Sequence, residues 1–230
     1  MNYKALLFGS IGTLIESSDI QRNSFNQAFN EAGLDWYWDE QDYRVLLKKS
    51  GGTKRVEDFA EKNNVNVNAE KIRNRKTEIF SSFISQNKQE LRQSVSKIIK
   101  FSKENNIKLG FSTSTTINNV DAVFESLKNQ ISKDDFDFIG NKTLVKYEKP
   151  NPEIYKITIE NLNLRPDECL AIEDTEESSK SAVNAGIKCI GFPGEYHVDD
   201  NFHMCEKKMN LLDQSIFSLS SSSSPPAAAA

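Results

Sequence analysis

Histidine and cysteine, the side chains that most often hold transition metals, are scarce in this sequence. The two histidines, His197 and His203, lack metal-ligand spacing, so we expect both to be structural. The three cysteines, Cys169, Cys189 and Cys205, are an odd number without a CxxC pair, and the first two lie in apolar runs typical of strands. Buried free thiols are therefore predicted in preference to disulfides or metal ligands.

Long apolar runs and dense basic stretches are also missing. No run approaches the roughly 18 apolar residues of a membrane-spanning helix, and the first residues enter a short strand without a signal-peptide pattern. The net charge of -4 comes from interspersed charges of both signs, without the basic footprint that binds a phosphate backbone. We therefore expect a soluble, cytoplasmic protein whose partners include neither nucleic acid nor membrane.

Short apolar runs and helical patterns alternate along most of the chain of 230 residues. The alternation predicts an α/β fold with a parallel sheet and helices on both faces, and it places the carboxyl ends of all strands at one edge. Ligands bind at this edge in such sheets. The predicted strands are 5–8, 107–111, 136–139, 169–172 and 189–192.

One region breaks the alternation, because residues 18–91 are mostly polar helical pattern without a strong strand. We predict a helical insertion there, with the α/β core formed by residues 1–17 and 92–218. In the insertion, apolar residues recur at helical spacing from Phe25 onward, and Gly33 is placed where a helix ends. The low-complexity residues 219–230 predict a disordered tail.

Four segments carry polar residues in a recognisable order. The first predicted strand runs into residues 9–14 (GSIGTL), the second into Thr113, and the fourth into Glu173 and Asp174, while a lysine opens residues 149–155 (KPNPEIY). These segments resemble the haloacid dehalogenase superfamily, in particular its helical-capped β-phosphoglucomutase-like and CbbY-like sugar-phosphatase members. The resemblance implies a Rossmann-like parallel-sheet core with an inserted α-helical cap.

The resemblance also implies that two catalytic groups are missing from this chain. The family motif DxDGT has a nucleophilic aspartate and a general-acid aspartate where this chain has Gly9 and Ile11. Neither residue can attack phosphorus or transfer a proton. Alternation along an extended segment predicts that the intervening Ser10 faces away from the site. No intact catalytic residue is therefore predicted.

The remaining motif residues are implied to bind ligands. Thr113 and Lys149 match the phosphate-binding residues of the family, and Glu173 and Asp174 match its magnesium ligands. Because the third carboxylate is missing, we predict a weakened Mg²⁺ site. Structural alternatives stay open, since a strand-end threonine often caps a turn, a lysine before proline is often solvated, and an acidic pair stabilises a helix N-terminus.

The insertion resembles a CbbY-like cap over residues 24–52. Its glycine loop places Gly52, Lys54 and Arg55 where such caps present substrate-selecting residues, although exposed charges are the structural alternative for the lysine and the arginine. Of the polar residues that follow the first motif in the family, only Glu16 and Asp19 persist. These two are the nearest carboxylates that a non-standard catalytic site would recruit.

Three functions are compatible with these residues. The first is a pseudoenzyme that has lost phosphatase activity and binds a sugar phosphate or a protein partner. The second is an active magnesium-dependent phosphatase or phosphomutase with a non-standard nucleophile. The third is a structural scaffold without a small ligand. The sequence names neither the sugar, the partner nor the oligomeric state.

Overall fold

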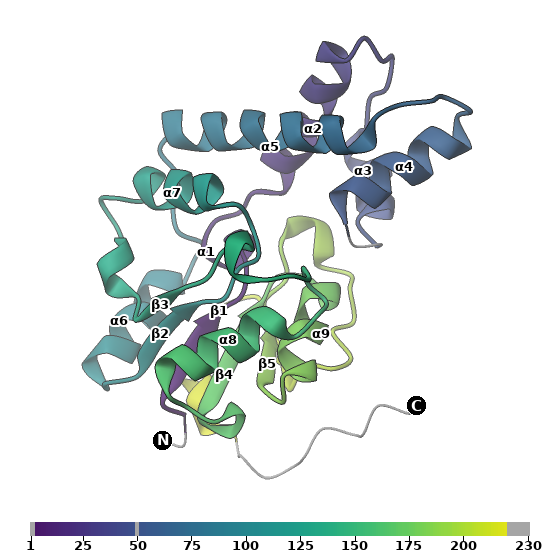
Figure 1. Cartoon of the computed structure of the whole chain (residues 1–230). Coiled ribbons are helices and arrows are strands. Elements are labelled where there is room, and N and C mark those ends of the chain that lie inside the picture. Colours follow the sequence, from purple (N-terminus) through teal and green to yellow (C-terminus); the bar gives the residue numbers. More distant parts are fainter. Residues whose placement is uncertain (1–2, 49–50, 220–230) are drawn as a thin grey trace.

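The computed structural model describes residues 3–48 and 51–219, and its centre is a parallel sheet of six strands (Figure 1). The strand order is β3-β2-β1-β4-β5-β6, and every neighbouring pair is parallel. The predicted α/β fold is confirmed. The strands are β1 (Ala5–Phe8), β2 (Lys108–Phe111), β3 (Phe138–Ile139), β4 (Cys169–Glu173), β5 (Lys188–Gly191) and β6 (Lys207–Lys208).

Helices cover both faces of this sheet because both sides of its central strand are apolar. Side chains alternate between the faces of a strand, so Leu6 and Phe8 of β1 enter one core cluster and Ala5 and Leu7 the other. Helices α6 and α7 cover the first cluster, and α8 and α9 cover the second. The bounds are α1 (Ile11–Leu14), α6 (Val95–Glu104), α7 (Ile117–Ser126), α8 (Glu153–Leu162) and α9 (Glu176–Asn184).

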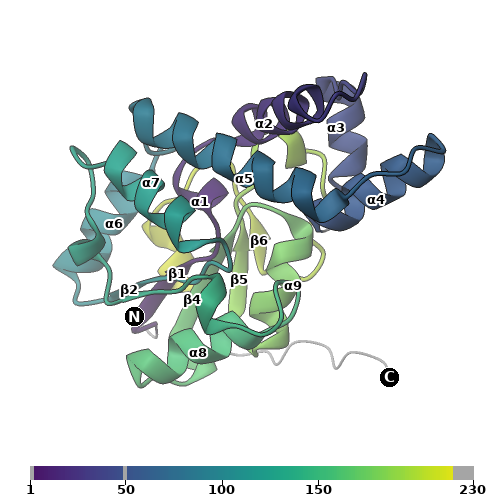
Figure 2. The same cartoon turned by 45° about the horizontal axis from the view of Figure 1, so that its top comes forward.

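Four further helices form a separate layer above the carboxyl edge of the sheet (Figure 2). Helix α2 ends where Gly33, at φ +72, adopts a left-handed conformation, as the sequence predicts. An aromatic cluster around the fully buried Trp38 holds the layer together, with Phe29 packed against it edge to face at 4.6 Å between ring centroids. The helices are α2 (Ser18–Glu31), α3 (Glu40–Leu46), α4 (Gly52–Lys62) and α5 (Ala69–Gln86).

Side chains of the helical layer pack in the core, and a side chain of the core packs in the helical layer. The far end of α5 contributes Phe80 and Ile84 to the core cluster. In return, Tyr196 from the loop after β5 packs in the cap cluster, and its hydroxyl donates to Asp19 and accepts from Arg22. These contacts fix the position of the cap over the sheet edge.

The remaining sequence-based expectations concern the thiols and the tail. Cys169 and Cys189 are buried free thiols, as predicted, and Cys205 is a half-buried free thiol. The predicted tail lies outside the described residues from position 220 onward, but Leu219 packs against the larger core cluster. Among the described residues, every helix is too short or too polar to cross a membrane.

We predict that Tyr196→Ala lowers the free energy of unfolding by about 3–5 kcal/mol, because it removes a buried ring and leaves Asp19 and Arg22 without their hydroxyl partner. Urea denaturation followed by tryptophan fluorescence measures the change, since both tryptophans lie in the cap. Tyr147→Ala is the control, because that side chain is 55% exposed. Equal stability of the two variants would contradict the proposed anchoring of the cap.

Candidate functional site

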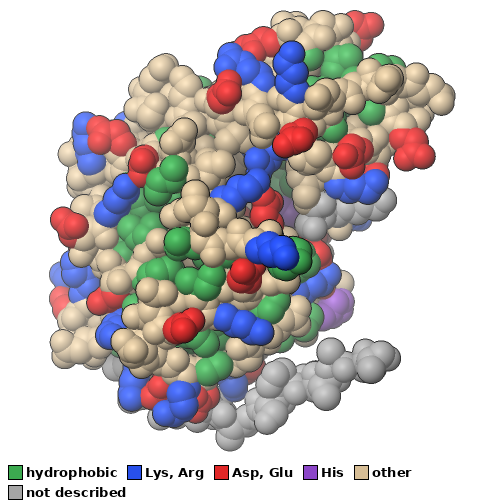
Figure 3. Space-filling view, in the orientation of Figure 1, with side chains coloured by type: hydrophobic (Ala, Val, Ile, Leu, Met, Phe, Trp, Pro, Cys, Tyr) green, Lys and Arg blue, Asp and Glu red, His purple; other side chains and the backbone are tan. Residues whose placement is uncertain are grey.

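A cavity of about 340 Å³ lies between the cap and the carboxyl edge of the sheet. The core lines it with the loop after β1, the segment Thr113–Thr115 after β2, Glu148 and Lys149, the segment after β4 that contains Asp174, and His197. The cap contributes residues of all four of its helices, α2 to α5. Figure 3 shows Lys and Arg side chains gathered at the hollow between the helical layer and the core. The motif segments therefore meet where the parallel sheet predicts a ligand site.

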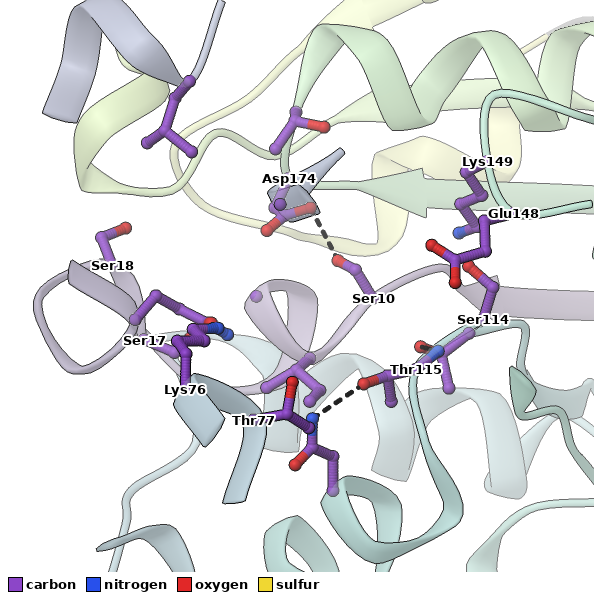
Figure 4. Close-up of a pocket in the computed structure, with 18 of the residues that line it drawn as sticks. Ser10, Ser17, Ser18, Lys76, Thr77, Ser114, Thr115, Glu148, Lys149 and Asp174 are labelled. Carbon is purple, nitrogen blue, oxygen red and sulfur yellow. Dashed lines mark hydrogen bonds between the residues drawn. The ribbon is translucent and has the colours of Figure 1, made fainter. Parts of the chain in front are cut away.

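Hydroxyl groups line the core side of this cavity. Thr113 is buried, and its Oγ1 accepts the backbone N–H of Thr115 at 3.2 Å, as the structural alternative for this residue predicts. Thr115 Oγ1 in turn accepts from the side-chain amide of Asn119 at 3.0 Å (Figure 4). Thr113 nevertheless lines the cavity, so the same side chain contacts the turn and faces the cavity.

Lys149, Glu173 and Tyr155 form a buried polar cluster beside Gly9. Lys149 Nζ lies 2.5 Å from Glu173 Oε1 and donates to the Gly9 carbonyl oxygen, also at 2.5 Å. The Tyr155 hydroxyl donates to the same Glu173 oxygen at 2.7 Å. The Lys149 ammonium is therefore already neutralised by a carboxylate of the protein.

A side chain at position 9 would have to displace the side-chain ends that pack against Gly9. A Cβ built on Gly9 would overlap the Glu173 carboxylate and the Tyr155 hydroxyl. Glu173 itself is fully buried and does not line the cavity. The space that an aspartate at position 9 needs is thus filled by Glu173 and Tyr155.

This arrangement does not fit a magnesium ion, although phosphatases of the family generally use Mg²⁺. Glu173 has one carboxylate oxygen on Lys149 and Tyr155, and its other oxygen is buried without a hydrogen-bond partner. Asp174 alone of the acidic pair faces the cavity. Within residues 3–48 and 51–219, no three His, Cys, Asp or Glu side chains cluster as metal ligands do. Of the two expected metal ligands, Glu173 is therefore buried in the core and Asp174 faces the cavity.

Ser10 corrects an expectation from the sequence. It lines the cavity, and its hydroxyl donates to Asp174 Oδ1 at 2.6 Å (Figure 4). The alternation argument was wrong because the strand ends at Phe8 and α1 begins at Ile11. Ile11 also reaches the cavity, but its side chain is buried in the core cluster.

Some residues of the cap loop face the cavity and others face solvent. Gly52 and Arg55 line the cavity, and Arg55 is buried, with its Nε donating to the Leu46 carbonyl oxygen at 3.0 Å. Lys54 was wrongly expected to face the substrate. It points away from the cavity and pairs with Asp58 at 2.6 Å, one helical turn further along α4.

Glu16 and Asp19 do not supply a carboxylate to the cavity. Glu16 accepts from the backbone N–H groups of Ser18 and Glu195, and Asp19 pairs with Arg22 and Tyr196. Both carboxylates therefore serve the junction between cap and core.

Several residues that line the cavity were not predicted from the sequence. Arg73 and Lys76 face it from α5, Glu148 lies beside Lys149, and the buried His197 approaches from the loop after β5. Their only sequence signal is local: the two basic residues lie three positions apart on one predicted helix, the spacing at which side chains share a helix face. Their approach to the motif segments depends on how the cap is docked.

The comparisons with known proteins agree with this geometry. Residues 11–192 match the haloacid dehalogenase-like hydrolase family. Protein CbbY of Rhodobacter capsulatus is 34% identical over 205 residues, which are 88% of this chain and 90% of that protein. Protein CbbY of Cereibacter sphaeroides is 31% identical over 202 residues, 86% of this chain and 88% of that protein. The chain belongs to the haloacid dehalogenase-like hydrolase family.

Solved structures support the same subfamily. CbbY from Rhodobacter sphaeroides in complex with phosphate has a TM-score of 0.81 at 29% identity, covering 93% of this chain and 96% of that chain. A mutant of that protein in complex with xylulose-(1,5)bisphosphate has a TM-score of 0.80 at 29% identity, covering 91% and 94%. β-Phosphoglucomutase from Clostridium difficile shares the fold, with a TM-score of 0.74 at 21% identity and coverage of 94% and 96%. The predicted CbbY-like, β-phosphoglucomutase-like family is confirmed.

We predict a pH-dependent loss of stability in Lys149→Met. Burial raises the pKa of Glu173 above its ordinary 4.5, and Lys149 offsets part of that rise. A carboxyl group with a raised folded-state pKa stabilises the protein below its unfolded pKa and loses this contribution as the pH rises through its folded pKa. Without the ammonium, the loss in unfolding free energy should be about 3–5 kcal/mol near pH 7.5 and smaller near pH 5, where Glu173 can take up a proton.

Urea unfolding at the two pH values measures this difference. The control is Lys142→Met, which removes an ion pair to Glu148 in which both side chains are 45% exposed. Its effect should stay below about 1 kcal/mol at either pH. A Lys149→Met loss of the same size at both pH values would contradict a buried, charged Glu173.

Proposed function

We propose that this protein binds a sugar phosphate between its cap and core and does not hydrolyse it by the family's aspartate chemistry. The observation that carries the proposal is the packing at Gly9, where Glu173 and Tyr155 fill the space that a nucleophilic carboxylate would need. Loss of a nucleophile alone costs about 10⁶-fold in other enzymes. The protein would then act through the bound ligand or through a partner that recognises the closed cap.

The cavity supports a phosphorylated ligand. Its core side offers the hydroxyls of Ser10 and Thr113, and its cap side offers Arg55, Arg73 and Lys76. Hydroxyls and cations are the groups that bind phosphate oxygens in proteins. The relatives named above include a protein crystallised with phosphate and with a sugar bisphosphate, which is the ligand class we propose.

We predict no magnesium-dependent hydrolysis of a sugar-phosphate panel above the rate of the Asp174→Asn variant, together with measurable binding of sugar phosphates by calorimetry. Thr113→Val should weaken this binding by about tenfold or more, because a hydrogen bond to a charged group contributes about 1.5–3 kcal/mol. Thr143→Val is the matched control, since Thr143 is exposed and bonds only Asn141 among the described residues.

Two results would reject parts of this proposal. Robust turnover that Asp174→Asn abolishes would establish an active enzyme. Absence of binding for every phosphorylated compound would favour the structural scaffold.

One observation favours a second candidate function, in which Ser10 accepts a phosphoryl group. Its hydroxyl lies in the cavity with Asp174 Oδ1 at 2.6 Å, where the carboxylate can take the proton as Ser10 Oγ attacks phosphorus. The bond between phosphorus and the leaving oxygen breaks as the new P–Oγ bond forms. An acyl phosphate suits this reaction, because its carboxylate leaves without the proton that Ile11 cannot supply. The phosphoserine would then persist, since Glu148, the other carboxylate that lines the cavity within residues 3–48 and 51–219, is paired with Lys142.

We predict that acetyl phosphate adds one phosphoryl group to the protein at Ser10, detected by intact-mass and peptide mass spectrometry. Ser10→Ala should remove the modification. Ser18→Ala should retain it, although Ser18 lines the same cavity and its hydroxyl also bonds a carboxylate, that of Glu16, at 2.5 Å. An unmodified protein, or modification spread equally over both serines, would exclude this candidate function.

A further inference from the structure

Lys76 faces the cavity from the cap and has an unusual environment for a lysine. Its Nζ lies 5.1 Å from the ring centroids of both Phe25 and Phe80, and it donates a hydrogen bond to Gln21 Oε1. Figure 4 shows Lys76 on the opposite side of the cavity from Lys149. The amine is therefore held among apolar rings, next to the space that a ligand would fill.

The charges around Lys76 are positive. Arg55 of α4 and Arg73 of α5 line the same cavity and act on the amine. Helix α2 contributes the neutral Gln21 and Phe25. On the core side Glu148 is paired with Lys142 at 2.7 Å and with Arg73 at 3.9 Å, and Asp174 accepts a hydrogen bond from Ser10. In the described part of the chain, no carboxylate lies within ion-pair distance of Lys76.

These surroundings disfavour the ammonium form. Burial, with the nearby Arg55 and Arg73 guanidinium groups, lowers the pKa of Lys76 to about 7. A substantial share of the side chain is then a neutral amine near neutral pH, and a neutral amine is a nucleophile. Lys149 Nζ, by contrast, is paired with the Glu173 carboxylate.

We propose that Lys76 forms an imine with the aldehyde or ketone carbonyl of a phosphorylated ligand bound in this cavity. The amine lone pair attacks the carbonyl carbon and a C–N bond forms. The carbonyl oxygen then leaves as water with the two amine hydrogens, so the reaction needs no oxidant or reductant. Burial, with Arg55 and Arg73, disfavours the ammonium form of Lys76, and the two guanidinium groups attract the anionic end of the ligand.

This inference rests on the proposed binding of phosphorylated ligands and narrows their class to carbonyl compounds. Open-chain aldose and ketose phosphates carry both required groups. The imine makes capture covalent and reversible, which gives a protein without hydrolytic turnover a means of retaining its ligand.

Reductive trapping tests the proposal directly. The full chain is incubated with glyceraldehyde 3-phosphate near pH 7, reduced with cyanoborohydride and mapped by peptide mass spectrometry. We expect the adduct at Lys76 to exceed that at Lys54 by more than about tenfold, because an ordinary lysine of pKa ≈ 10.4 is almost fully protonated at this pH. Lys54 is a matched cap lysine that is exposed and paired with Asp58.

Variants and a competitor separate a specific imine from random modification. Lys76→Arg introduces a guanidinium that stays charged and is not a nucleophilic amine, so it should abolish the cavity adduct, whereas Lys54→Arg should leave it unchanged. Glycerol 3-phosphate, which has no carbonyl, should compete with labelling of Lys76 and leave surface labelling intact. Equal labelling of Lys76 and Lys54, or no labelling of Lys76, would overturn the proposal.

Calorimetry distinguishes failure of the imine from failure of the binding function. If glycerol 3-phosphate binds but Lys76 is never trapped, the cavity is a phosphate site and the imine proposal alone is wrong. If glycerol 3-phosphate does not bind and Lys76 is not trapped, the proposed function is wrong as well.

Discussion

The carboxylate of Glu173 lies at the end of a central strand with no access to solvent, and a charge in that position requires a cation and hydrogen-bond donors. Lys149 and Tyr155 provide them, and the space to do so exists because position 9 is glycine. This cluster therefore determines what the core side of the cavity offers. Lys149, which the family resemblance implies as a phosphate-binding residue, is paired with Glu173, and the hydroxyls of Ser10 and Thr113 line this side of the cavity.

The cap changes the balance of charge in the cavity. On the core side, the acidic residues Glu148 and Asp174 accompany Lys149, whereas the cap side contributes Arg55, Arg73 and Lys76. An anionic ligand would thus be attracted mainly by the helical layer. The position of that layer depends on Tyr196, which packs into the cap from the core. The residues that would contact the proposed ligand and the residues that dock the cap therefore belong to the same interface between cap and core.

The loss of both motif aspartates affects different reactions unequally. A ligand whose leaving group is an alcohol needs a proton donor, and Ile11 cannot act as one. Binding, imine formation at Lys76 and transfer from an acyl phosphate to Ser10 do not need that donor. The proposed ligand capture and single transfer therefore use only groups that this chain retains, whereas hydrolysis by the family's aspartate chemistry would need the two missing carboxylates.

The sequence by itself determined the parallel α/β fold, the helical insertion and the family, because strand alternation, helix periodicity and motif order are local or one-dimensional properties. It also determined that Gly9 and Ile11 lack the chemistry of aspartate. Only the tertiary structure decided where side chains point. Ser10 faces the cavity because the strand ends two residues before it, and Lys54 faces solvent because of its position around α4. Burial of Glu173 and the lowered pKa of Lys76 depend partly on neighbours distant in sequence, such as Phe25 and Arg55 around Lys76, and a sequence pattern does not contain that desolvation.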